Sequence, residues 1–332
     1  MLKPLDHYWY STNLLSLLLL PLSGLLCSLG YLRQVLYKLG WLKSFKAPVP
    51  VVIIGNISVG GTGKTPLIIE LVNQLRLQGH RPGVISRGYG GQSATWPLRV
   101  NEQSTAAQVG DEPSLIYQTT GCPLVVGPDR KADIDLLLKT DDCDIILSDD
   151  GLQHYALERD LEIAVVDAQR LFGNGFCIPS GPLREPVSRL HQVDLVVFNG
   201  GSTDQVSFTM QAQQCCLLRD NSVINIESFA GQTVHAVAGI GHPQRFFSML
   251  EKQGINVIPH AFADHYVYSL DDIVFDDQLP VLMTEKDAVK CEAFETTNTW
   301  SVPVTVNLSN IAQKNIKQLF DTRIFNAIEP EV

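Results

Sequence analysis

A glycine-rich loop between a predicted strand and a predicted helix constrains this chain more than any other feature. The loop Gly55-Asn-Ile-Ser-Val-Gly-Gly-Thr-Gly-Lys-Thr65 follows the apolar run Val51–Ile54 and precedes a helical pattern over Pro66–Gln78. Its glycines let backbone N–H groups point at phosphate oxygens, Lys64 offers a cation to the β- and γ-phosphates, and Thr65 offers a hydroxyl to Mg²⁺. We predict that a nucleoside triphosphate is bound here, by the residues Ser58, Val59, Gly60, Gly61, Thr62, Gly63, Lys64 and Thr65.

A second apolar segment, further along the chain, ends in two carboxylates. The sequence Asp144-Ile-Ile-Leu-Ser-Asp-Asp-Gly-Leu-Gln-His154 predicts a strand with Asp149 and Asp150 at its tip. A carboxylate at such a tip completes the Mg²⁺ shell of phosphate-loop proteins, directly or through water. Thr65, Asp149 and Asp150 are therefore the predicted metal ligands, and which aspartate contacts the ion directly stays open.

Short apolar runs alternate with helical stretches from Pro50 onward, which predicts a parallel sheet with helices on both faces. The alternation stops from Gly200 to about Cys216, and strand patterns resume near Asn221. We expect an α/β fold with a phosphate-loop NTPase-like parallel-sheet domain, a second, smaller α/β domain and an N-terminal hydrophobic membrane helix. The predicted ranges are 1–46 for the membrane-associating segment, 47–200 for the phosphate-loop core, 201–220 for a linker and 221–332 for the smaller domain.

Charge and cysteine usage exclude several classes of protein. The 332 residues include 25 Lys and Arg against 35 Asp and Glu, a net charge of −10, whereas nucleic-acid binding needs a basic face. The 7 cysteines include no C-x-x-C pair and are odd in number, which argues against a disulfide framework or a zinc site. We therefore expect no nucleic-acid partner and reduced thiols in a cytosolic compartment.

The N-terminal region is apolar and is followed by a basic segment. Eleven leucines lie between Leu14 and Leu32, and the cations that follow are Arg33, Lys38, Lys43 and Lys46. No clear cleavage site supports a signal peptide. A buried core helix, a bilayer-spanning helix and a helix in the cytoplasmic interface remain open. Because Pro21 interrupts the run, we favour the interfacial helix, whose cations meet anionic headgroups, and expect the rest of the chain to be cytoplasmic.

Two classes of phosphate-loop protein fit these features. Membrane-surface ATPases that position cell-division or plasmid machinery carry a lysine just before the glycine pair, where this chain has Val59. A small-molecule or lipid kinase needs an acceptor site in addition to the nucleotide site. We prefer the kinase and keep the positioning ATPase as the alternative.

A series of short strings then narrows the class. In chain order they are Gly55–Pro66, Ser86-Arg-Gly-Tyr-Gly90, Val109-Gly-Asp-Glu-Pro113, Asp149–His154, Gly181-Pro-Leu-Arg-Glu185, Asp264-His-Tyr266 and Thr284-Glu-Lys-Asp287. Their joint order resembles the tetraacyldisaccharide 4′-kinase family, the lipid A 4′-kinases of Gram-negative bacteria, over nearly the whole chain. Ser58 stands where the general phosphate-loop pattern has glycine, but the loop of this family has its own form.

The resemblance implies a reaction and a location. The reaction is ATP- and Mg²⁺-dependent transfer of the γ-phosphoryl group to the 4′-hydroxyl of a membrane-embedded, tetraacylated glucosamine disaccharide 1-phosphate, a lipid A precursor. The location is the cytoplasmic face of the inner membrane, where a monotopic enzyme contacts the phospholipid bilayer. The resemblance also implies two α/β units joined by a short β linker, with the active site between them. A monomer is the default expectation.

Further site residues also rest on the resemblance. The resemblance implies that Asp111 pairs with His265 in the cleft between the units, where Asp111 takes the hydroxyl proton. Without the resemblance, the simpler interpretations are a helix cap for Asp111 and a packing histidine for His265. It places Arg184 and Glu185 at the substrate, with a surface ion pair as the alternative. From their loops, Arg87 is assigned to the substrate and Arg130 to the transferring charge, with exposed surface arginines as the alternative.

Overall fold

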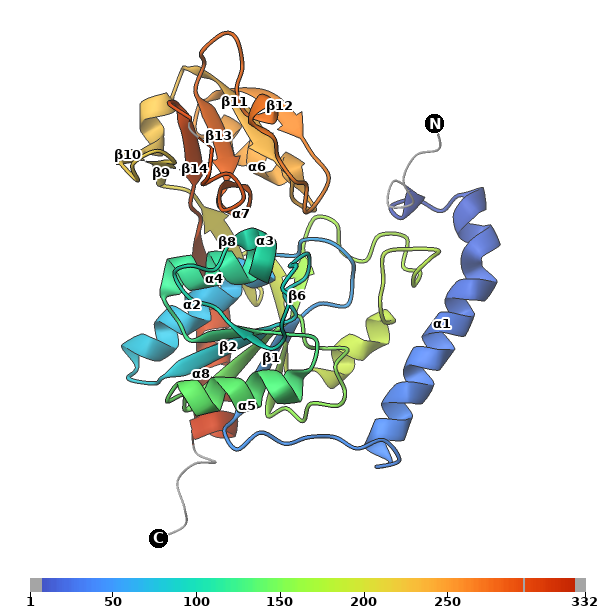
Figure 1. Cartoon of the computed structure of the whole chain (residues 1–332). Helices are drawn as coiled ribbons and strands as arrows, with labels where there is room; N and C mark the ends of the chain where they lie inside the picture. The colour runs from blue at the N-terminus through green and yellow to red at the C-terminus, as the bar shows by residue number, and fades with distance from the viewer. Residues whose placement is uncertain (1–7, 295, 326–332) are drawn as a thin grey trace.

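The chain folds into two α/β units, one above the other in Figure 1, and helix α1 (Leu14–Lys38) stands beside the larger unit. The structure is a computed structural model that describes residues 8–294 and 296–325. The larger unit holds a nine-stranded sheet and the smaller unit a six-stranded sheet. The expected α/β class is confirmed, with mixed sheets in place of purely parallel ones.

The larger sheet runs in the order β15-β8-β7-β6-β1-β5-β2-β4-β3, and only its edge strands β15 and β3 pair antiparallel. Its strands are β1 (Val51–Gly55), β2 (Pro82–Ser86), β3 (Leu98–Arg99), β4 (Leu124–Val126), β5 (Ile145–Asp149), β6 (Leu161–Asp167), β7 (Leu195–Asn199), β8 (Ser207–Gln211) and β15 (Thr305–Leu308). The central strands are apolar runs because helices or loops cover both faces. Since parallel strands end at one edge, the segments after β1, β2, β5 and β6 all open on the same side.

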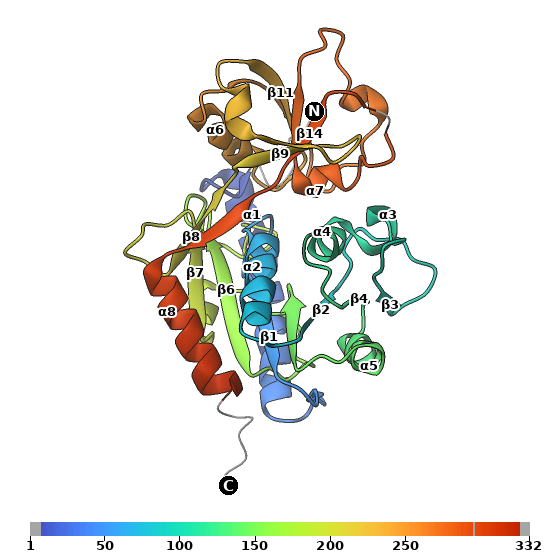
Figure 2. The same cartoon turned by 90° about the vertical axis from the view of Figure 1, so that its left-hand side faces the viewer.

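Helices and loops cover the two faces of the larger sheet. The helices of this unit are α2 (Lys64–Leu77), α3 (Ala106–Val109), α4 (Asp111–Thr120), α5 (Arg130–Thr140) and α8 (Asn310–Leu319). On one face α2 buries Leu67, Leu71 and Leu75, whose helical spacing gives a single apolar stripe, in the same core as residues of α4 and α8. Figure 2 looks onto α2 and α8. On the opposite face α5 packs through Ile134 and Leu137.

The smaller sheet runs in the order β10-β9-β14-β13-β11-β12, with a parallel half and an antiparallel half. Its strands are β9 (Gln214–Leu217), β10 (Val223–Asn225), β11 (Thr233–Ala238), β12 (Asn256–Ala261), β13 (Val281–Thr284) and β14 (Thr299–Val302). Helix α6 (Pro243–Lys252) packs on β12 and β11, and the short helix α7 (Glu285–Ala288) follows β13 toward α4.

Two strands, and not one linker, connect the units. β8 continues through Ala212 and Gln213 into β9, and β14 returns into β15, which pairs with β8. The predicted linker 201–220 therefore contains strands of both sheets. The predicted smaller domain 221–332 is wrong at its C-terminal end, because β15 and α8 rejoin the larger unit and pack in its core.

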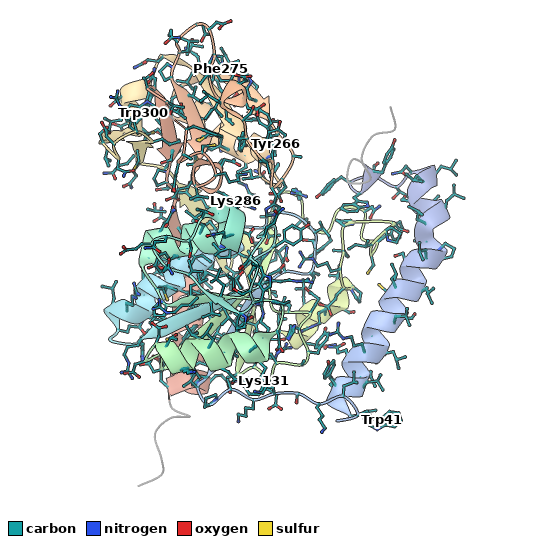
Figure 3. All side chains as sticks on the ribbon, in the orientation of Figure 1. Trp41, Lys131, Tyr266, Phe275, Lys286 and Trp300 are labelled. Carbon is teal, nitrogen blue, oxygen red and sulfur yellow. The ribbon has the colours of Figure 1, made fainter. Side chains whose placement is uncertain are left out.

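Helix α1 contacts the larger unit along one side only. Ser23 Oγ donates to the carbonyl oxygen of Cys177 at 2.8 Å, and Gln34 Nε2 donates to Gln192 Oε1 at 3.0 Å. Leucines on its other side are exposed, which contradicts the buried-core alternative, and Trp41 beyond its end is also exposed (Figure 3). The helix continues through Pro21. Within residues 8–294 and 296–325 no helix is both long and apolar enough to cross a membrane.

Candidate active site

The glycine-rich loop leads from β1 into α2 at the open edge of the larger sheet. Gly63 has a φ of 95°, and a Cβ there would lie 2.4 Å from Asn199 Nδ2, so only glycine fits. Asn199 Nδ2 donates to the carbonyl oxygen of Thr62 at 3.0 Å and thereby fixes the loop to β7. Lys64 is buried, with Nζ 3.3 Å from Asn56 Oδ1. A buried cation at the N-terminus of α2 is the geometry that binds phosphate.

Three carboxylates gather beside Lys64. Asp149 ends β5, Asp150 follows it, and Glu112 lies in the first turn of α4. Burial and the neighbouring charge of Glu112 raise the pKa of Asp149 to about 7. Burial also raises the pKa of Asp150, but the charges of Lys64 and Arg184 outweigh it and leave this pKa below its usual value. Asp150 and Glu112 are thus paired with cations, whereas Asp149 has no salt bridge in the described part of the chain, and an added cation would favour its charged form.

Oxygen atoms at this strand tip fit a hard metal ion. Asp149 Oδ1 is buried and accepts no hydrogen bond from the described part of the chain, and such an atom needs a partner. Asp150 Oδ1 also accepts none there, although Lys64 Nζ lies 3.6 Å from it. Thr65 lies next to Lys64 in the first turn of α2. Across residues 8–294 and 296–325, no group of three His, Cys, Asp or Glu side chains could hold a metal by itself. Carboxylate and hydroxyl oxygens such as those of Asp149, Asp150 and Thr65 are donors that Mg²⁺ accepts, and phosphate and water usually complete its shell.

Asp111 and His265, 154 positions apart in the chain, meet where the units touch. His265 Nδ1 lies 3.0 Å from Asp111 Oδ2, within hydrogen-bond distance, and the Tyr89 ring lies 5.0 Å from the imidazole ring. His265 has a φ of 59°, a left-handed backbone uncommon outside glycine and often found at functional positions. Burial raises the pKa of Asp111, but the hydrogen bond from His265 and the charges of Lys290 and Lys286 outweigh it, so the pKa is lowered.

The predicted substrate residues Arg184 and Glu185 lie beside the acidic strand end. Arg184 Nη1 donates to Asp150 Oδ2 at 2.7 Å, which links it to the predicted metal site. Glu185 Oε2 accepts from Gln153 Nε2 at 2.7 Å, and the Tyr155 hydroxyl donates to Glu185 Oε1. The two residues share Gln153 as a partner, since Arg184 Nη1 also donates to Gln153 Oε1 at 3.4 Å. The salt bridge of Arg184 is with Asp150 and not with Glu185, so a surface pair between the two predicted residues does not describe this geometry.

The two remaining predicted arginines differ in exposure. Arg87 follows β2 and is exposed at the open edge of the sheet. Arg130 is 4% exposed, and its guanidinium donates to the carbonyl oxygens of Gly127 at 3.3 Å and Asp149 at 3.1 Å, and to Asp133. It therefore supports the end of β5 from within the protein, which contradicts the exposed-surface alternative, and its role toward the transferring charge stays a prediction.

A cavity of about 530 Å³ separates the glycine-rich loop from the smaller unit. Lys64, Thr65 and Glu112 line it from the larger unit, Arg245 and Met249 of α6 from the smaller one, and Val304 from the connecting strands. A volume of this size suits a nucleotide. The lining combines phosphate-binding groups of the loop with apolar side chains such as Leu115 and Phe246, and a nucleotide needs both kinds of contact.

Sequence reasoning missed the charges that join the units here. Lys286 Nζ donates to Glu112 Oε1 at 3.1 Å, and Figure 3 shows Lys286 at the junction. On the far side of the loop, Arg245 Nη2 donates to Asp167 Oδ1 at 2.8 Å. Glu112 and Lys286 lie within strings noted for the family, so a signal existed, but nothing local to Asp167 or Arg245 predicts their pairing.

The fold and this cavity define a phosphate-loop nucleotide-binding protein whose site is completed by a second α/β unit. Comparison with known proteins specifies it further. The family model described as tetraacyldisaccharide-1-P 4′-kinase matches residues 15–324, and the chain therefore belongs to that family. The structure of an "apo" form LpxK from Aquifex aeolicus, in complex with ATP, has a TM-score of 0.75 and 32% identity, covering 92% of this chain and 100% of that one.

Relatives of similar length agree with this assignment. The tetraacyldisaccharide 4′-kinase of Nitrosococcus oceani is 51% identical over 303 residues, which cover 91% of this chain and 90% of the relative. The protein of the same name from Methylobacillus flagellatus is 49% identical over 322 residues, which cover 95% of each chain.

Proposed function

We propose that this chain uses ATP to phosphorylate the 4′-hydroxyl of a tetraacylated glucosamine disaccharide 1-phosphate, a precursor of lipid A. The observation that carries the proposal is the pairing of Asp111 with His265 across the two units, next to Glu112, which lines the nucleotide cavity. A phosphate loop alone would serve an ATPase equally well. A positioned base beside the loop is what an alcohol acceptor needs, and the family relationship supports this choice of acceptor.

Asp111 is the proposed base. It takes the proton of the 4′-hydroxyl as that oxygen bonds to the γ-phosphorus, while the bond from phosphorus to the β,γ-bridging oxygen breaks and ADP leaves with the electron pair. Burial raises the pKa of Asp111, but the hydrogen bond from His265 and the charges of the nearby lysines outweigh it, so the carboxylate is ionised and can accept a proton at neutral pH. His265 orients the carboxylate through its 3.0 Å contact.

The remaining residues provide charge and position. Lys64 and the N-terminus of α2 stabilise the negative charge of the γ-phosphoryl group during transfer. Thr65, Asp149 and Asp150 are the residues that would hold Mg²⁺, which when bound supplies positive charge between the phosphates. Arg184, Glu185 and Arg87, at the same sheet edge, are the proposed acceptor-side residues.

Helix α1 is proposed to lie in the membrane interface on the cytoplasmic face of the inner membrane. Exposed leucines on its outer side would enter the acyl layer, and basic side chains from Arg33 to Lys46 would meet anionic headgroups. This arrangement brings the active site to a membrane-embedded acceptor. A single chain contains every proposed site residue, so a monomer suffices.

A phosphoryl-transfer assay tests the proposal directly. The full chain in detergent is given ATP, Mg²⁺ and the tetraacylated disaccharide 1-phosphate, and the lipid product is followed by mass spectrometry. We expect a product with one added phosphate at the 4′ position and one ADP per product. ATP hydrolysis that is independent of the lipid and increases on dimerisation would contradict the kinase and favour the positioning ATPase.

A further inference from the structure

A buried ammonium group of the smaller unit lies beside the Asp111 carboxylate. Lys290 follows α7, its side chain is 10% exposed, and its Nζ lies 3.8 Å from Asp111 Oδ2. The same oxygen faces His265 Nδ1. One carboxylate oxygen of the larger unit is thus in contact with two nitrogen-bearing side chains of the smaller unit.

The position of Lys290 is fixed by a buried carboxylate behind it. Asp287 Oδ1 lies 2.7 Å from Lys290 Nζ, and the Asp287 side chain is fully buried. Asp287 Oδ2 accepts from the Gly239 N–H at 2.8 Å and from Thr284 Oγ1 at 2.6 Å, so this carboxylate cannot turn away. The Lys290 Nζ also lies 4.9 Å from the centre of the Tyr268 ring, within cation–π range.

The backbone is shaped around this cluster. Gly239 directly follows β11, and a Cβ there would lie 2.5 Å from the Tyr268 hydroxyl oxygen and 3.0 Å from Asp287 Oδ1, so a larger residue would displace the cluster. Burying an ammonium group is costly unless it is paired and well placed. The smaller unit pairs Lys290 with Asp287 and still directs it at a carboxylate of the other unit.

We propose that Lys290 is a positioning residue, whose anchored charge keeps Asp111 ionised to lower pH while the two units are docked. The inference rests on the proposed function of Asp111 as the base. Asp111 belongs to α4 of the larger unit, whereas Lys290 and His265 belong to the smaller unit. Separation of the units therefore removes both partners from the base together.

Other charged groups face Asp111, and they do not replace Lys290. Lys286 is nearby, but it is shared between Glu112 at 3.1 Å and Asp264 at 3.2 Å. The larger unit contributes two other titratable groups around Asp111 and Lys290, namely Glu112 of α4 and Tyr89 after β2. The smaller unit contributes Asp264, His265 and Tyr268 between β12 and β13, Lys286 and Asp287 of α7, and Cys291 after α7. An opposite charge at such a distance lowers the pKa of an aspartate by about 1 to 3.

The test measures the protonation of Asp111 separately from catalysis. Full-length protein labelled with ¹³C at aspartate carboxyls is titrated by NMR, and the Asp111 signal is assigned by its loss in Asp111→Asn. Lys290→Met removes the charge, Lys290→Arg keeps it, and Lys317→Met removes an exposed lysine paired with Asp321 as the matched control. Because Lys290→Met leaves Asp287 unpaired, the double variant Lys290→Met/Asp287→Asn is titrated as well.

We expect the pKa of Asp111 to rise by about 1 or more in Lys290→Met and in the double variant, and to stay near wild type in the two other variants. The acidic limb of the kcat–pH profile should move to higher pH by the same amount, with the plateau within about threefold of wild type. A structural role would instead lower kcat equally at every pH.

The outcomes separate the inference from the proposed function. An unchanged Asp111 pKa in both charge-removing variants overturns the inference, as does a uniform loss of kcat with an unmoved acidic limb and an unmoved pKa. A raised pKa with an unmoved limb supports the electrostatic coupling to Lys290 and contradicts Asp111 as the base. A raised Asp111 pKa together with an acidic limb moved to higher pH supports both the inference about Lys290 and the proposed role of Asp111 as the base.

Discussion

Lys64 Nζ lies 3.6 Å from Asp150 Oδ1, so the glycine-rich loop and the acidic end of β5 share one charge pair. Arg184 holds the other oxygen of Asp150 at 2.7 Å. The carboxylate is therefore fixed between two cations from different loops. A phosphate group entering the loop would meet Lys64 already in place.

Replacing Lys64 should remove most of the activity and leave the fold. We expect Lys64→Ala to lower kcat on the order of 100-fold or more, because the γ-phosphoryl group loses a preorganised cation in the transition state. Turnover is measured with the lipid acceptor, and folding by thermal melting. Lys131→Ala, which removes an exposed lysine paired with Asp135, is the control and should behave as wild type. Near-normal turnover in a folded Lys64→Ala protein would exclude this site.

The Asp111–His265 pair should behave as one unit. We expect Asp111→Ala and His265→Ala each to reduce kcat strongly, and the double variant to lose far less than the product of the two factors, because both act on one proton transfer. The measurement is kcat at saturating ATP and acceptor. Fully multiplicative losses, or variants that change only the KM for ATP, would remove the pair from the mechanism.

Asp149 should make stability depend on pH. Its pKa of about 7, raised by burial and by the neighbouring Glu112 charge, means that the native state binds more protons than the unfolded state between about pH 4 and 7. The free energy of unfolding therefore falls as pH rises through this window. Without Mg²⁺, the free energy of unfolding of the Asp149→Asn variant should exceed that of wild type at pH 8 by on the order of 1 kcal/mol or more. This difference should vanish near pH 4.

Two comparisons check this expectation by urea denaturation and thermal melting. Asp141→Asn should instead lower the free energy of unfolding near neutral pH. The hydrogen bond from Arg99 lowers the pKa of Asp141, so the ionised carboxylate stabilises the native state near neutral pH and this stabilisation is lost in acid. Mg²⁺ should raise the melting temperature of wild type more than that of Asp149→Asn. A loss of stability in Asp149→Asn at pH 8 would contradict the assignment.

The outer side of α1 should control membrane binding. Leu18, Leu25 and Leu29 are 69%, 56% and 53% exposed, so changing all three to Gln alters the surface and not the core. We expect much weaker sedimentation with anionic vesicles, since apolar burial drives interfacial binding. Leu77→Gln, at an 88% exposed leucine of α2, is the control and should bind normally. Equal sedimentation of the triple variant and wild type would exclude α1 as the anchor.

The parts of the site that the sequence predicts are those with local causes. Lys64 follows a strand and opens a helix, and Asp149 ends an apolar run, so each is recognisable from its own neighbours. The strand order brings them together, because β1 and β5 are adjacent and parallel. β15 at the edge of the sheet and β8 beside it were missed because they are short and carry polar residues on one face.

The parts that could not be predicted from local pattern are contacts between the units. Asp167 meets Arg245, and Asp111 meets Lys290, only after two separate sheets have formed and docked. Arg130 shows a different limit: its charge is visible in the sequence, but its burial beneath Asp149 depends on the packing of α5.

The pairing of β15 with β8 has a consequence for the order of folding. Gln211 and Thr305 are partners in the ladder, yet the entire smaller unit lies between them in the chain. Closing so long a loop from an unfolded chain has a large entropic cost. Once the smaller unit has formed, however, its first and last strands, β9 and β14, already lie side by side and bring the loop ends together. During synthesis, the larger sheet therefore keeps an unpaired edge until the last strand leaves the ribosome, and chaperones have that interval in which to protect it.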